Sequence, residues 1–178
     1  AGLSSLLAML FGTVYAVELH FSMSFLAARE RVSKLRNVVL LTMDTSRSYA
    51  LSAFAANRRI RAAVIDGAHD ERSVFTDIYA ALTDIPCCVE VVVFHDYCDK
   101  EVFSAVQRFV GADILAFYRP IGDNPGVYWW CADGRPEGAA FLVNRVGNLR
   151  ERLASAHRSF HGIISLDGSM KQVTGPPG

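Results

Sequence analysis

The sequence predicts an α/β fold: a mostly parallel, doubly wound sheet in three layers (α/β/α), with an antiparallel C-terminal end. Three observations predict it. Apolar strand patterns alternate with helical patterns as far as Gly111, which is typical of parallel strands joined by crossover helices. The run over 89–94 is unbroken and apolar, as in a central parallel strand. Three strand patterns then follow one another with no helix between them, which indicates antiparallel pairing.

In the first part of the chain the elements alternate regularly. Gly12 suits the C-cap of the opening helix, and the second helix is amphipathic, with its charged residues along one side. Helices are expected over 4–11, 23–35 and 49–57, and strands over 14–17, 37–42 and 62–65.

The second part begins with the clearest helical pattern, in which Val74, Ile78 and Leu82 form one apolar stripe. Glycine- and proline-rich turns at 120–126 and 133–138 separate the last strands. Helices are expected over 71–82, 100–110 and 148–160, and strands over 89–94, 114–117, 127–131 and 139–143.

Composition indicates one globular domain, which we place at 1–160 with a tail at 161–178. The 178 residues are 51% hydrophobic and 20% charged, enough to build a sizeable core. The formal net charge is zero, which argues against a nucleic-acid partner. The apolar opening over 3–17 is too short to span a bilayer and lacks the basic start of a signal peptide, so no membrane partner is expected.

The four cysteines show neither zinc nor redox spacing. Cys87 and Cys88 are adjacent, and no C-x-x-C pair occurs. We therefore expect reduced thiols in a cytoplasmic protein.

The tail at 161–178 raises a question of chain order. Residues 168–170 read Gly-Ser-Met, like a cloning scar followed by an initiator methionine. Joined to residue 1, the segment 171–178 reads as a short strand and a glycine turn leading into the first helix. Circular permutation, a numbering artefact and chance are the three explanations.

Two predicted strands end in acidic residues. Asp66 follows the strand at 62–65, with His69 close behind, and His95 and Asp96 follow the strand at 89–94. A carboxylate is costly to bury without a partner, but at a strand end it reaches the crevice at the carboxyl edge of a parallel sheet. Open α/β sheets bind their ligands in that crevice.

The order of these motifs resembles the class I S-adenosylmethionine-dependent methyltransferases. The closest similarity is to small-molecule O-methyltransferases, in which one strand ends in IDG-x-H and a later one in FHD, as at 65–69 and 94–96 here. The resemblance covers about residues 1–143. It implies a Rossmann-like fold, S-adenosylmethionine as cofactor and a small-molecule acceptor, such as a sugar or secondary-metabolite hydroxyl.

The resemblance also implies how the cofactor is held. Gly2 begins a turn that allows close backbone approach, and Glu18 would bind the ribose hydroxyls. Asp44 would meet the adenine amino group, although it could equally cap the next helix. The implied cofactor-binding residues are Gly2, Glu18, Asp44, Asp66, Gly175 and Gly178.

In metal-dependent relatives the same corner holds a divalent cation. Here Asp66, His95 and Asp96 would be the ligands of Mg²⁺, although His95 departs from the oxygen ligands that Mg²⁺ prefers. Without a metal, His69 or His95 would act as general base, with Asp66 beside the acceptor. For both histidines a purely structural hydrogen-bonding role is the alternative.

Three further points stay open in the sequence. Four aromatic residues would line an acceptor pocket or pack in the core or in an interface: Tyr118, Tyr128, Trp129 and Trp130. The chain has little room for a cap over the acceptor, so the pocket would be open or completed in a homo-oligomer. An NAD-dependent oxidoreductase, which lacks support from a full G-x-G-x-x-G, and an inactive methyltransferase-like binding or assembly module are the alternative functions.

Overall fold

The computed structural model describes residues 9, 11–18, 29–30, 33–43, 58–83, 89–121 and 135–172; at 18, 42 and 162–172 it describes the backbone alone. The chain divides into two compact units, residues 1–50 and 51–178, and each is described by itself. Both contain parallel strands, so the α/β class is confirmed.

The first unit contains a parallel pair of strands. β1 (Val14–Glu18) pairs with β2 (Val38–Thr42) in a register that runs from Val14 opposite Val38 to Glu18 opposite Thr42. Both strands lie where the apolar runs predict them. Most of the helices expected over 4–11 and 23–35, and all of the one over 49–57, fall outside the described residues.

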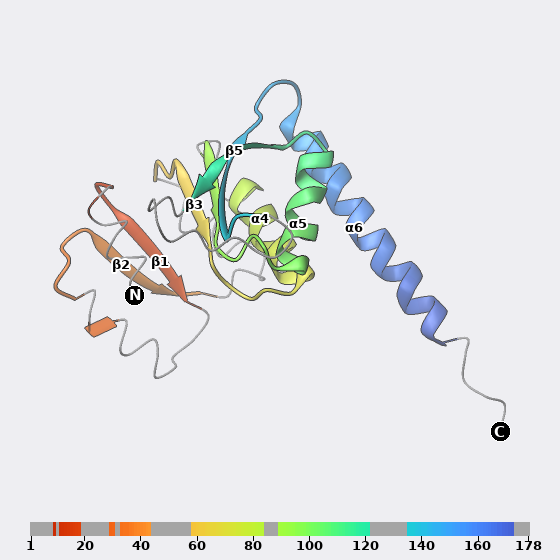
Figure 1. The fold of residues 1–178 in the computed structure, drawn as a ribbon, viewed down its shortest axis with the longest axis horizontal. Coiled ribbons are helices and arrows are strands. Elements are labelled where there is room, and N and C mark those ends of the chain that lie inside the picture. The colour runs from red at the N-terminus through yellow and green to blue at the C-terminus, as the bar shows by residue number, and fades with distance from the viewer. Residues whose placement is uncertain are drawn as a thin grey trace. The chain divides into compact units, whose positions relative to one another are not determined.

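The second unit is built on a four-stranded mixed sheet (Figure 1). β3 (Ala62–Ile65) and β4 (Val91–Phe94) are parallel. β6 (Gly138–Val143) lies between β4 and β5 (Leu115–Ile121) and is antiparallel to both. The antiparallel C-terminal end is therefore confirmed, while the strand expected at 127–131 lies outside the described residues.

Among the described helices of this unit, α4 and α5 begin at capping aspartates. Asp70 accepts a hydrogen bond from the Ser73 backbone N–H and precedes α4 (Glu71–Thr83). Asp99 accepts from the backbone N–H groups of Glu101 and Val102 at the start of α5 (Lys100–Gly111). These caps explain why both helices begin where the sequence predicts.

α6 (Leu149–Gln172) is longer than predicted. The helical pattern ends at Phe160 in the sequence, where Gly162 follows closely, but no proline interrupts the segment before Pro176 and the helix continues. Lys171 and Gln172 are helical here, whereas joining the chain ends would make them the start of a strand. The domain boundary at 160 and the origin of the tail stay predictions.

The core lies between the sheet and the helices on one side of it (Figure 1). Phe94 and Phe141 lie on the same face of the sheet and meet edge to face at 5.6 Å. From α4, Phe75 stacks on Phe160 of α6 at 4.1 Å and contacts Phe109 of α5 at 4.8 Å. All five rings are buried, so they hold the three helices to each other and to the sheet.

The prediction of reduced thiols is wrong for Cys98, which is disulfide-bonded. The other cysteines, Cys87, Cys88 and Cys131, lie outside the described residues. Spacing rules failed here because they find paired motifs along the sequence, whereas a disulfide requires only proximity in the fold. None of the described helices is long and apolar enough to cross a membrane.

Candidate functional site

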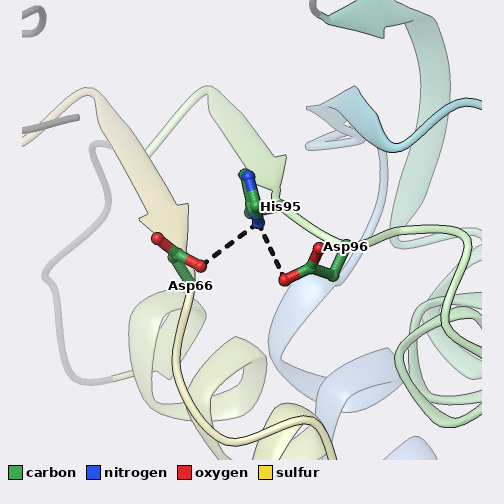
Figure 2. A group of neighbouring side chains, drawn as sticks. All are labelled: Asp66, His95 and Asp96. Atoms are coloured by element: carbon green, nitrogen blue, oxygen red, sulfur yellow. Dashed lines mark ion pairs between the residues drawn. The ribbon is translucent and has the colours of Figure 1, made fainter. Parts of the chain in front are cut away.

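The parallel pairing of β3 and β4 brings two acid-ended strands together. Ile65 lies opposite Phe94 in the register, so the next residues, Asp66 and His95, are neighbours at the same edge of the sheet. The backbone N–H of His95 donates to the Ile65 carbonyl at 3.1 Å, which continues the strand pairing by one step. Figure 2 shows the two side chains approaching each other from the strand ends.

Asp96 reaches the site through an unusual backbone conformation. Its φ of 50° lies in the left-handed region, which aspartate tolerates better than most side chains. The turn is held on both sides, because Asp99 N–H donates to the Asp96 carbonyl at 2.8 Å and the buried Tyr97 donates its N–H to the Glu137 carbonyl at 2.5 Å. The Asp96 carboxylate consequently turns back toward His95 (Figure 2).

The result is a connected group of two carboxylates and two histidines (Asp66, Asp96, His69 and His95), which we call the acid–histidine group. His95 Nδ1 lies 2.8 Å from Asp96 Oδ2 and 3.4 Å from Asp66 Oδ1. His69 Nε2 lies 3.1 Å from the same Asp96 oxygen. Asp96 is the least exposed side chain at 29%, while the other three are 45–48% exposed. The group is therefore held firmly at its centre and open to a ligand at its rim.

The carboxylates control the proton affinity of His95. Partial burial by itself would lower the pKa of His95, since it disfavours the imidazolium. The hydrogen bond to Asp96 and the negative charges of Asp66 and Asp96 together outweigh that effect and raise the pKa above its ordinary value. His95 is therefore a stronger base than a free imidazole.

The residues also fit a divalent cation. One ligand atom from each of Asp66, His95 and Asp96 lies within 4.8 Å of the others. Adjacent ligands of an octahedral ion with bonds of about 2.1 Å lie about 3 Å apart, close to the two measured histidine–carboxylate distances. The mixed nitrogen and oxygen set suits a first-row transition ion better than Mg²⁺.

Of the other predicted site residues, the structure describes only Glu18, His69 and Tyr118. Glu18 is the last residue of β1, at the carboxyl edge of the parallel pair. Tyr118 lies on β5 and is 57% exposed, with the Arg119 guanidinium 5.8 Å from its ring centre, so it is not a core residue. Gly2, Asp44, Tyr128, Trp129, Trp130, Gly175 and Gly178 lie outside the described residues.

One surface feature that the sequence reasoning missed is an open depression of about 800 Å³ beside α5. Arg135 lies over the Phe103 ring at 4.2 Å, and Arg108 is held by Glu71 at 2.6 Å. The polar residues along one face of α5 are the feature of the sequence from which this depression could have been predicted. No residue of the acid–histidine group lines this depression, so that group remains the better candidate for catalysis. The depression is lined by Lys100, Phe103, Ser104, Gln107, Arg108 and Arg135.

Comparison with known proteins adds no relative to this account. A scan against models of protein families finds no match, and a search of curated proteins finds no similar sequence. The geometry of the acid–histidine group and the motifs that carry it are therefore the basis for inferring a function.

Proposed function

We propose that this protein is an S-adenosylmethionine-dependent O-methyltransferase that acts on a small-molecule hydroxyl. The supporting observation is the acid–histidine group, in which the register of β3 and β4 brings Asp66 and His95 together and side-chain contacts add Asp96 and His69. The Rossmann-like, three-layer arrangement is part of the proposal, and the parallel strand pairing within each unit supports its α/β class.

The chemistry requires a hydroxyl aligned with the methyl group and a base that removes its proton. His95 Nδ1 faces the two carboxylates, and its other ring nitrogen points away from them (Figure 2). A hydrogen on Nδ1 donated to Asp96 leaves the lone pair on Nε2 to take the acceptor's proton. Asp96 and Asp66 then stabilise the imidazolium that forms.

A divalent ion is the second way in which the same residues would activate the acceptor. Asp66, His95 and Asp96 would hold it, and it would lower the pKa of an acceptor hydroxyl and orient it. The two roles are exclusive at His95 Nδ1, because the nitrogen either carries a hydrogen for Asp96 or offers its lone pair to the ion. Activity before and after chelation therefore distinguishes them.

Glu18 is the proposed contact to the cofactor. It ends a parallel strand, where the ribose of a nucleotide is held in open α/β sheets. Its carboxylate would accept hydrogen bonds from both ribose hydroxyls. The turn at Gly2 and the acid at Asp44 complete the cofactor part of the proposal.

Calorimetry with S-adenosylhomocysteine and with NAD tests the cofactor. We expect the full chain to bind S-adenosylhomocysteine and to ignore NAD, and Glu18→Ala to weaken binding by about tenfold or more through two lost hydrogen bonds. Glu90→Gln is the matched control, because Glu90 is an exposed acid paired with Arg61 at the opposite end of β4. Failure of the wild-type chain to bind S-adenosylhomocysteine would refute the proposal.

The base is tested by release of S-adenosylhomocysteine from a panel of small hydroxyl compounds. His95→Gln should lower kcat by about 100-fold or more if it removes a general base. The Glu90→Gln control should retain full activity. Full activity of both His95→Gln and Asp96→Asn would show that the acid–histidine group has no role in the reaction.

A further inference from the structure

The open depression beside α5 differs in chemistry from the acid–histidine group. It measures about 800 Å³, which lies in the size range of small-molecule sites. Three of its six lining residues are cations and none is acidic. Arg135, from the segment before β6, lines one part of it. The other five lining residues recur at helical spacing along one face of α5: Lys100, Phe103, Ser104, Gln107 and Arg108.

Arg108 keeps hydrogen-bonding capacity for a ligand. Its Nε donates to Glu71 Oε1 at 2.6 Å, and its guanidinium lies 5.2 Å from the centre of the Phe160 ring. Ser104 Oγ donates to the same Glu71 oxygen at 2.9 Å, which fixes the acid beside the helix. Within the described part of the chain the two terminal nitrogens of Arg108 make no hydrogen bond. The side chain is therefore positioned by Glu71 and still has N–H groups to offer an anion.

The other two cations border the depression in different ways. Lys100 is exposed in the first turn of α5, and its side chain makes no hydrogen bond or ion pair with the described residues. Arg135 is partly buried, and its guanidinium lies 4.2 Å from the centre of the Phe103 ring. That contact limits the motion of a long side chain, which lowers the entropy cost of ordering it around a ligand. Lys100 and Arg108 start from points about 12 Å apart along the helix axis.

We propose that this depression binds the diphosphate group of a small molecule. Phosphate oxygens accept charge-assisted hydrogen bonds from lysine and arginine, and the guanidinium fork matches their geometry. A diphosphate presents charged oxygens on two linked phosphoryl groups, so it can meet cations that approach from separate points better than a carboxylate or a single phosphate can. The Phe103 ring gives the organic part of the ligand an apolar surface to contact.

Calorimetric titration of the full chain with inorganic pyrophosphate tests this site, which does not depend on the proposed methyl transfer. EDTA in the buffer removes divalent ions that could bridge pyrophosphate to the acid–histidine group. We expect binding at low ionic strength that weakens as salt is added. Inorganic phosphate should bind about tenfold more weakly, because it offers fewer charged oxygens. Absence of pyrophosphate binding would overturn the proposal, and so would an equal affinity for phosphate.

Lys100→Gln and Arg108→Gln should each weaken pyrophosphate binding by about tenfold or more, because each removes charge-assisted hydrogen bonds. Since Lys100 is exposed, its variant should fold normally, which circular dichroism checks. Arg150→Gln is the matched control, because it removes the same charge from an exposed residue of α6 that does not line the depression. Wild-type affinity in Lys100→Gln would contradict the proposal. An equal loss in Arg150→Gln would also contradict it, because net charge alone would then explain the binding.

Discussion

Two histidines of the second unit, His95 and His157, differ in what surrounds their rings, and their pKa values shift in opposite directions. His95 lies between two carboxylates, which outweigh burial and raise its pKa. His157 lies against aromatic rings, where burial first and the charge of His161 second lower its pKa. Partial burial is common to both, so the sign of the neighbouring charge decides the outcome.

The strongest test of this comparison removes Phe75, one of the aromatic rings beside His157. Phe75→Ala should destabilise the fold by about 3–5 kcal/mol, because Phe75 is 1% exposed and contacts the rings of α5 and α6. The pKa of His157 should return toward its ordinary value as water reaches the ring, while that of His95 stays raised. Urea denaturation and NMR titration of the histidines measure the two effects. An unchanged His157 pKa in a folded variant would contradict the burial explanation.

Removing the charge beside His95 should have the next largest effect. Asp96→Asn replaces the carboxylate that accepts at 2.8 Å and also removes the partner of His69. We expect the pKa of His95 to fall, because the hydrogen bond and charge of Asp96 no longer offset the effect of burial. The pKa of His157 should stay the same. NMR titration measures both, with Glu90→Gln as the control that changes a distant acid. A His95 pKa that stays raised would mean that Asp96 is not the controlling charge.

The pH dependence of stability should reflect both the raised pKa of His95 and the lowered pKa of His157. A raised pKa means that His95 stabilises the fold fully below about pH 6.5, the unfolded value, and that this contribution is lost as pH rises through the folded pKa. For His157 the sign reverses, so its contribution favours the fold above about pH 6.5 and is lost as pH falls through the lower folded pKa.

Urea denaturation across pH 5–9 (roughly 1.5 units below to 2.5 units above the histidine value) separates the contributions of His95 and His157. His95→Gln should remove the first dependence and His157→Gln the second. Identical pH profiles for the two variants would remove the basis of the comparison.

The smallest expected effect is at the start of α4. Asp70→Ala should cost about 1 kcal/mol, because it removes the cap that accepts from Ser73 N–H. The hydrogen bonds from Ser73 lower the pKa of Asp70, so this contribution is present above the unfolded value of about 4 and fades as pH falls below it. Urea denaturation at pH 7 and at pH 3 measures the difference, which should shrink at the lower pH.

The acid–histidine group could be predicted from the sequence because strand patterns and strand ends are local signals. Once β3 and β4 are parallel neighbours, Asp66 and His95 must meet. The left-handed turn at Asp96 and the contact with His69 depend on tertiary contacts, and no sequence pattern predicts them. The roles of these residues stay predictions.

The contact between His157 and His161 on α6 was missed because the predicted helix ended at Phe160, one residue before His161. The spacing of His157 and His161 was present in the sequence, but it has meaning only on a continuous helix. The disulfide of Cys98 left no local signal at all. Local periodicity thus predicts what lies within an element, whereas helix ends and cross-links depend on the rest of the fold.

The position of β6 has a consequence for the order in which the sheet forms. β6 is the only described strand that joins β4 to β5, and it comes last in the chain among the described strands. Until residues 138–143 have left the ribosome, β5 lacks its partner and one edge of β4 is unpaired. The nascent second unit therefore exposes an apolar strand edge of the kind that templates aggregation, and β6 covers this edge once it is synthesised.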